Sequence, residues 1–99
     1  MTTNNPDLFG DVIDVETVHK DSSLPLQVAQ HVLWHFGDEH LGLQPGEFTT
    51  RLLLTISAAD KTNRDKLAVA FPDYVLAYRA VGNEPWGLDW LRKIAREQG

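Results

Sequence analysis

Apolar residues recur three or four positions apart along most of this 99-residue chain, from Ser22 to the C-terminal end. This spacing is typical of amphipathic helices, because residues that far apart share one helix face. The pattern is clearest near the end of the chain, where Trp86, Trp90 and Ile94 stand at i, i+4 and i+8. An apolar helix face must be buried against another element, so the spacing predicts an all-α fold around one shared core.

Capping residues, prolines and glycines divide this region into four to five short helices. The expected helices run from residue 25 to 37 or 42, from 45 or 46 to about 59, from 62 to 71, from 73 to 81 and from 85 to the end of the chain. We expect Thr62 to cap the third helix, Gly82 to close the fourth, and Asn83 or Glu84 to cap the fifth. The connectors between them are short, which predicts a compact bundle.

The second expected helix is apolar nearly all round. Phe48, Leu52 and Ile56 align on one face, while Leu53 and Leu54 occupy the other sides. A helix of this kind is usually the buried centre of a bundle, and we expect it to be so here.

Charge divides the chain into two parts. The net charge is −5, and residues 1–23 contribute five carboxylates against one lysine, whereas nine acidic and eight basic residues leave the remainder nearly neutral. We therefore expect an acidic N-terminal arm (1–23) followed by a helical domain (24–98). A nearly neutral domain makes nucleic-acid binding unfavourable, because such binding needs a basic face.

Within the arm, residues 11–18 (DVIDVETV) are rich in β-branched side chains that alternate between two faces. We expect the arm to be extended or to form a strand. A single strand is not stable alone, so it has to lie on the domain, pair with a second copy in a homodimer, or bind a partner. The apolar residues expected to make a partner contact are Leu8, Phe9, Ile13 and Val15.

The stretch Asp7-Leu8-Phe9 resembles the end of the peptide motif by which bacterial proteins bind the replication sliding clamp, where adjacent Leu and Phe fill an apolar pocket. Two positions depart from that motif, because Asn5 stands where it prefers glutamine and Pro6 replaces a leucine. The resemblance implies the sliding clamp as one candidate partner.

The chain has no cysteine, which excludes disulfides and thiolate metal sites. Its first residues have neither the basic nor the apolar region of a signal peptide, and no apolar run approaches the roughly 18 residues that span a bilayer. We expect a cytoplasmic protein without membrane contact.

The stretch HVLWHFGDEH holds the densest group of reactive side chains. His31, His35 and Glu39 stand at i, i+4 and i+8, with Asp38 and His40 beside them, and two histidines one turn apart can bind one zinc ion. The pattern favours the alternative, in which both rings border the apolar helix face and are half-buried, because the HExxH arrangement is absent. We expect neither a metal nor another cofactor.

By helical phase, Trp34 points to the polar side of the first helix, between Gln27 and Gln30. A large aromatic side chain there is covered by another part of the chain, such as residues 11–18, or is offered to a partner. Trp34 therefore joins the candidates for partner binding.

Catalytic patterns are missing. Ser57 and the helical threonines have no suitably spaced base, and GLQPGEF lacks the lysine and hydroxyl of a phosphate-binding loop. We predict that the protein is not an enzyme.

A helix-turn-helix DNA-binding regulator is the alternative function from another class. Its helices would be the second and third expected ones, with Arg51, Lys61, Arg64 and Lys66 contacting phosphates. The nearly neutral domain and the presence of Asp65 among these bases weigh against this alternative.

Residues 41–81 resemble small uncharacterised helical proteins of actinobacteria and their phages. The resemblance rests on PGEFTT, on the Asn63-Arg64 pair followed by Leu67, and on AFPDYV. It implies a helical phage or phage-derived accessory protein, and it carries no site residues because those proteins have no assigned activity. With Trp34 and the acidic arm, it leads to the prediction of a non-enzymatic module that binds another protein.

Overall fold

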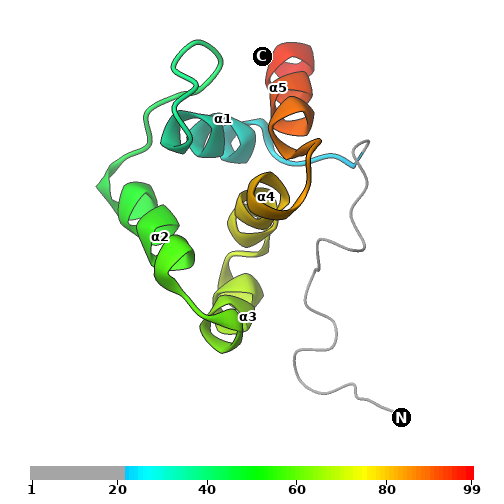
Figure 1. Cartoon of the computed structure of the whole chain (residues 1–99). Helices are drawn as coiled ribbons and strands as arrows, with labels where there is room; N and C mark the ends of the chain where they lie inside the picture. Colours follow the sequence, from blue (N-terminus) through cyan, green and yellow to red (C-terminus); the bar gives the residue numbers. More distant parts are fainter. Residues whose placement is uncertain (1–21) are drawn as a thin grey trace.

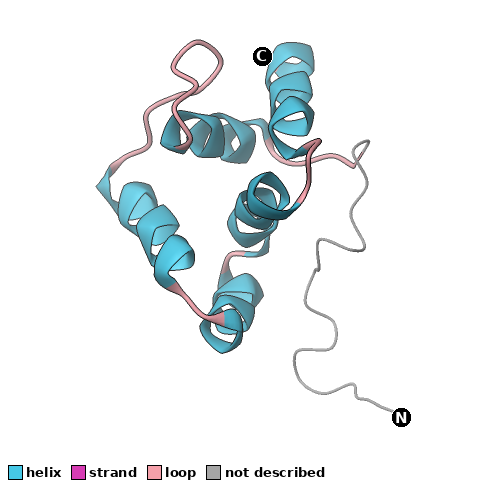
Figure 2. Cartoon of the chain, in the orientation of Figure 1, coloured by secondary structure: helices cyan, strands magenta, loops and turns pink. Residues whose placement is uncertain are grey.

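The computed structural model describes residues 22–99, which form five α-helices and no strand (Figures 1 and 2). The helices are α1 (Leu26–His35), α2 (Glu47–Ala58), α3 (Lys61–Ala70), α4 (Pro72–Asn83) and α5 (Gly87–Gln98). The predicted all-α bundle of short helices is therefore confirmed for this part of the chain. The predictions for residues 11–18 lie outside the described residues.

The central helix of the fold is α4. It packs against α1, α2, α3 and α5, whereas α2 packs on α4 and α1 only along part of its surface. Ala77 and Ala80 of α4 are completely buried, and their small side chains let neighbouring helices approach from several sides. The centre of the bundle is therefore a helix with alanines, and α2 lies at one side of the molecule (Figure 1).

The prediction that the second helix is the buried centre is wrong. Its apolar residues are divided between two environments: Leu53 and Ile56 are in the core, whereas Phe48 and Leu54 are 66% and 54% exposed. A helix that is apolar nearly all round but packs on one side only must present apolar residues to the outside.

The hydrophobic core combines side chains from all five helices in unequal shares. Only Ala68 of α3 is buried, so α3 is the helix least anchored in the core. The largest fully buried side chains are Leu33, Leu53, Ile56, Leu91, Val32 and Val75.

Helix α1 ends next to Gly37, one of the two glycines predicted to end it. Gly37 has a φ of 97°, a conformation that favours glycine. Its N–H donates to the carbonyl of Trp34 at 3.0 Å, and the N–H of Asp38 donates to that of Leu33 at 3.0 Å, which together form a Schellman motif. The last helical residue is His35, so Glu39 lies in the following loop.

Three other helix ends differ from the predictions. Asp60, and not Thr62, caps α3, because its side chain accepts from the N–H of Asn63 at 2.9 Å. Helix α4 continues through Gly82 for one further residue. Helix α5 begins at Gly87, two residues beyond the expected Pro85. A Cβ atom on Gly87 would meet the carbonyl oxygen of Ala80 in α4. The close approach of α4 and α5 therefore requires glycine at that position.

The first described residues are attached to α5. The indole N–H of Trp90 donates to the carbonyl of Ser22 at 2.7 Å, and Leu24 is 4% exposed within the core. Residue 24, where the helical domain was expected to start, thus belongs to the packed part of the fold. No helix of residues 22–99 is long and apolar enough to span a membrane.

Candidate functional site

A groove lies between the C-terminal half of α2 and the middle of α3. It forms because α3 packs on α4 and not along α2. The groove has a volume of about 350 Å³, at the lower end of the roughly 300–1,000 Å³ of small-molecule pockets. It therefore has room for a few side chains of a partner. Its lining residues are Thr55, Ala58, Ala59, Asn63, Lys66 and Leu67.

Phe48 lies on the groove side of α2, about two turns before the first lining residue, Thr55. Phe48 and Thr55 stand seven residues apart, which places them on the same side of the helix. The Phe48 ring is 66% exposed, and its centroid lies 5.8 Å from that of Phe71 in a tilted contact. The ring is thus held in place by an aromatic neighbour while most of its surface faces outward. Exposed aromatic residues of this kind anchor protein–protein contacts.

Two of the four bases predicted for phosphate contact pair with carboxylates of their own helix. Arg51 lies 2.6 Å from Glu47, and Lys61 lies 2.9 Å from Asp65. Both pairs have the i, i+4 spacing that suits a solvated helix surface. They are therefore neutralised locally and do not add to a basic face.

The other two bases, Arg64 and Lys66, lie on different sides of α3. The Arg64 guanidinium donates to the carbonyl of Ala59 at 3.3 Å, where it supports the connector between α2 and α3. Lys66 lines the groove and has no hydrogen bond or ion pair to any residue of 22–99. At about 100° per residue, the two side chains point roughly 160° apart, so the structure does not bring the four bases onto one surface.

The first histidine of the predicted cluster is buried and hydrogen-bonded. His31 is 6% exposed, and its Nδ1 atom shares a 2.8 Å hydrogen bond with the hydroxyl of Tyr74 on α4. The two rings are stacked with centroids 6.1 Å apart. Burial lowers the pKa of His31, so the neutral ring is favoured. The expectation that His31 is half-exposed is therefore wrong.

One turn further along both helices, His35 packs against Tyr78 with ring centroids 5.5 Å apart. His35 is half-buried as expected, and burial lowers its pKa too. His31 with Tyr74 and His35 with Tyr78 thus form two successive ring contacts that join α1 to α4. We call these four residues the His–Tyr ladder.

Asp38, the first acidic residue after α1, holds a loop in place. One carboxylate oxygen of Asp38 accepts from the backbone N–H groups of His40 and Leu41, and the other accepts from Arg92 of α5 at 2.9 Å. These hydrogen bonds hold the pKa of Asp38 below its usual value. Glu39 is exposed. Within residues 22–99, no three potential ligands come together in a group that could hold a metal ion.

Trp34 is half-buried, and the loop after α1 folds back beside it. Gly42 approaches the backbone of Trp34 so closely that a Cβ atom would clash, and the N–H of Leu43 donates to the carbonyl of Gln30 at 3.0 Å. Part of the cover on the polar side of α1 therefore comes from residues 42–43. The other partner-binding candidates, Leu8, Phe9, Ile13 and Val15, lie outside the described residues.

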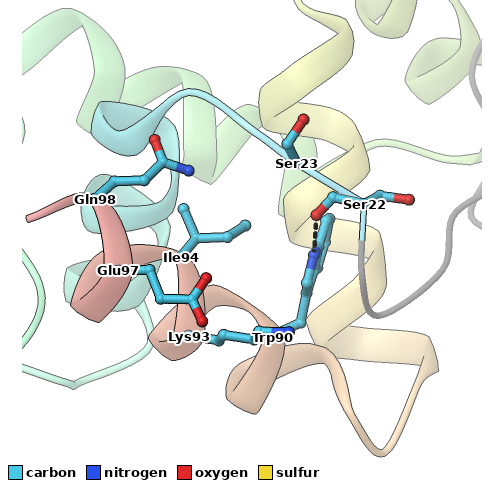
Figure 3. A pocket seen from close by; sticks show the side chains of 7 residues that line it. All are labelled: Ser22, Ser23, Trp90, Lys93, Ile94, Glu97 and Gln98. Atoms are coloured by element: carbon cyan, nitrogen blue, oxygen red, sulfur yellow. Dashed lines mark hydrogen bonds between the residues drawn. The ribbon is translucent and has the colours of Figure 1, made fainter.

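A second, smaller hollow lies beside α5 (Figure 3). Its volume is about 90 Å³, well below the roughly 300 Å³ of the smallest ligand pockets. The figure shows the indole of Trp90 pointing at Ser22 across one end of it. This hollow is best explained as the packing boundary between the first described residues and α5.

The groove and its exposed aromatic residue were missed by the sequence analysis. The signal was the helix that is apolar nearly all round, which was interpreted as a buried centre. Comparisons of the chain with protein-family models, curated proteins and solved structures find no match. A functional interpretation therefore depends on the geometry and chemistry of residues 22–99.

Proposed function

We propose that this protein is a non-enzymatic module that binds another protein, and that the groove between α2 and α3 is its contact surface. The observation that carries the proposal is the exposed Phe48 ring, which is held by Phe71 on the same side of α2 as an apolar groove. The proposal extends to a cytoplasmic, phage or phage-derived accessory protein that acts on a host protein. The resemblance of residues 41–81 supports this extension.

The distribution of exposed apolar residues supports a contact at this edge of the fold. Five large apolar side chains of residues 22–99 are exposed, and Phe48 of α2, at 66%, is the most exposed of the five. Single exposed apolar residues are ordinary, but an aromatic ring next to a groove is typical of binding surfaces. The proposal therefore adds the α2–α3 edge to the two earlier contact candidates, which are Trp34 and the acidic arm.

The experiment is a pull-down from bacterial lysate, read by mass spectrometry, with three versions of the full chain as bait. Phe48→Ala removes the exposed ring, and Leu54→Ala is the matched control. Leu54 is a similarly exposed apolar residue of the same helix, and its side chain points about 120° away from that of Phe48 around the helix axis. Alanine keeps the helix propensity high in both variants.

We expect the wild type and Leu54→Ala to capture the same specific protein, and Phe48→Ala to lose most of it. Removal of an aromatic anchor usually costs about 2 kcal/mol or more of binding free energy, which is roughly a thirtyfold loss of affinity. If the two variants capture the partner equally well, the groove is not the contact surface. A fourth bait that lacks residues 1–21 shows whether the acidic arm contributes.

A further inference from the structure

The four basic side chains of α2 and α3 differ in whether they have an interaction partner. Of the lysines and arginines on α2 and α3, Arg51 and Lys61 pair with carboxylates, and Arg64 donates to a backbone carbonyl. Only Lys66 reaches the groove without an interaction partner in the described part of the chain. No carboxylate lines the groove. A molecule bound there would therefore meet one unneutralised positive charge beside apolar side chains.

Phe48 and the groove, with the exposed Arg51–Glu47 pair beside them, together form a strip as long as a short helix. From Phe48 to Ala59 the chain advances eleven positions along α2 and its cap, which corresponds to about 16 Å at 1.5 Å per residue. Along this strip, Ala58 and Ala59 are small and leave space for close approach, whereas Leu67 and Phe48 offer larger apolar surfaces. A partner helix of three turns covers such a strip with residues at i, i+3 or i+4, and i+7.

A partner that binds to the described residues can contact side chains there, but it finds no open sheet edge. Residues 22–99 contain no strand, so a partner cannot bind there by adding a strand to a sheet. Grooves between helices are commonly filled by the apolar face of another helix. An extended peptide would leave its backbone N–H and C=O groups without partners in a groove lined mainly by methyl groups.

We propose that the groove binds an amphipathic helix of a partner protein, whose apolar face enters the groove and which carries a carboxylate next to Lys66. This inference rests on the proposed function and specifies the chemistry of the partner. The apolar contacts supply most of the affinity, while the carboxylate opposite Lys66 selects acidic helices over basic ones.

The test uses a displayed library of random peptides of about 14 residues, long enough as a helix to cover the strip. The full chain is the target, and binding of the selected peptides is measured by fluorescence anisotropy. We expect apolar residues three or four positions apart, with Asp or Glu at one preferred position. In nuclear magnetic resonance spectra, the peptides should shift the amide signals of Thr55, Asn63 and Leu67.

A charge exchange then tests the role of Lys66. Lys66→Glu should weaken binding of a selected peptide about fivefold at low salt, because attraction becomes repulsion at a partly desolvated contact. Replacing the peptide's carboxylate by lysine should weaken binding to the wild type and restore it to Lys66→Glu. Arg96→Glu is the matched control, since Arg96 is exposed on α5 and the change in net charge is identical.

Three results would overturn the inference: a library that yields no binding peptide, selected peptides without a preferred carboxylate, or equal effects of Lys66→Glu and Arg96→Glu. The proposed function is judged separately by Phe48→Ala in the pull-down. A partner that requires Phe48 but tolerates Lys66→Glu retains the proposed function and rejects the acidic helix. Thermal unfolding of each variant confirms that it remains folded.

Discussion

Replacing Tyr74 by phenylalanine tests whether the His–Tyr ladder stabilises the fold by hydrogen bonding. The Tyr74 hydroxyl lies 2.8 Å from Nδ1 of His31, which is 6% exposed. Tyr74→Phe removes the hydroxyl and keeps the ring, so the stacking of the two rings at 6.1 Å is retained. The imidazole nitrogen of His31 then has no partner in a place that water reaches poorly, and the Thr49 side chain loses its hydrogen bond with the same hydroxyl.

The expected loss follows from the desolvation of that nitrogen. A buried polar group left without its hydrogen bond costs about 1–3 kcal/mol. In a domain of this size, about 1 kcal/mol lowers Tm by about 4–8 °C, so Tyr74→Phe should lower Tm by at least about 4 °C. The measurement is thermal unfolding followed by circular dichroism near pH 8, where histidine is neutral.

The double variant His31→Phe/Tyr74→Phe separates the hydrogen bond from the packing. If both polar groups are removed, no buried nitrogen is left unsatisfied, so the double variant should lose less stability than the two single variants together. A Tm for Tyr74→Phe within about 1 °C of the wild type would refute the reasoning, as would strict additivity of the two changes.

Four further predictions concern pH, an ion pair and packing. Burial lowers the pKa of His31 and His35, so below about pH 6.5 the unfolded chain takes up protons that the folded state resists. The unfolding free energy should therefore fall as the pH is lowered from that point, by up to about 1.4 kcal/mol per pH unit for each histidine. In urea titrations, an unfolding free energy that stays constant between pH 8 and 5 would contradict this. Arg92→Gln should cost about 1 kcal/mol in urea unfolding, because Arg92 pairs with the carboxylate of Asp38, which is only 12% exposed. The lowered pKa of Asp38 adds stability at neutral pH that is lost in acid as that carboxylate takes up a proton, and a parallel acid titration of Arg92→Gln should show a weaker loss. Gly87→Ala should lower the unfolding free energy by about 1–3 kcal/mol, since the added methyl group meets an α4 carbonyl, and a variant as stable as the wild type would show that the two helices can separate without cost.

The helices could be predicted from the sequence, because helical spacing of apolar residues identifies a buried face without reference to its partner. The spacing at Trp86, Trp90 and Ile94 defined α5, and Gly37 marked the end of α1. The residue that caps α3 could not be predicted from the sequence with the same certainty as the helix itself. Asp60 and Thr62 are both capable of capping, and the choice depends on which side chain reaches the backbone N–H groups in three dimensions.

The arrangement of the helices could not be predicted in the same way. Periodicity shows which residues of α2 share a face, but the coverage of each face depends on α4, whose buried Ala77 and Ala80 allow close packing on several sides. For this reason, the exposed ring of Phe48 was assigned to the core. The position of Lys66 at the groove was equally hidden, because the groove is lined by residues of both α2 and α3 and cannot be recognised from either helix alone.

The burial of His31 shows the same limit for polar residues. The sequence placed His31 at the border of an apolar face, and it gave no sign that Tyr74, forty-three positions away, would supply a hydrogen-bond partner. A polar side chain enters a core when such a partner is present. Sequence spacing within one helix therefore underestimates the burial of residues that pair across helices.

The most direct test of a binding surface at the α2–α3 groove is hydrogen–deuterium exchange of the full chain, alone and with the protein that it captures. The groove accounts for binding only if the partner slows exchange in residues 48–67, with little change in α5. Slower exchange confined to α1 around Trp34, or to α5, with residues 48–67 unchanged, would contradict a binding surface between α2 and α3.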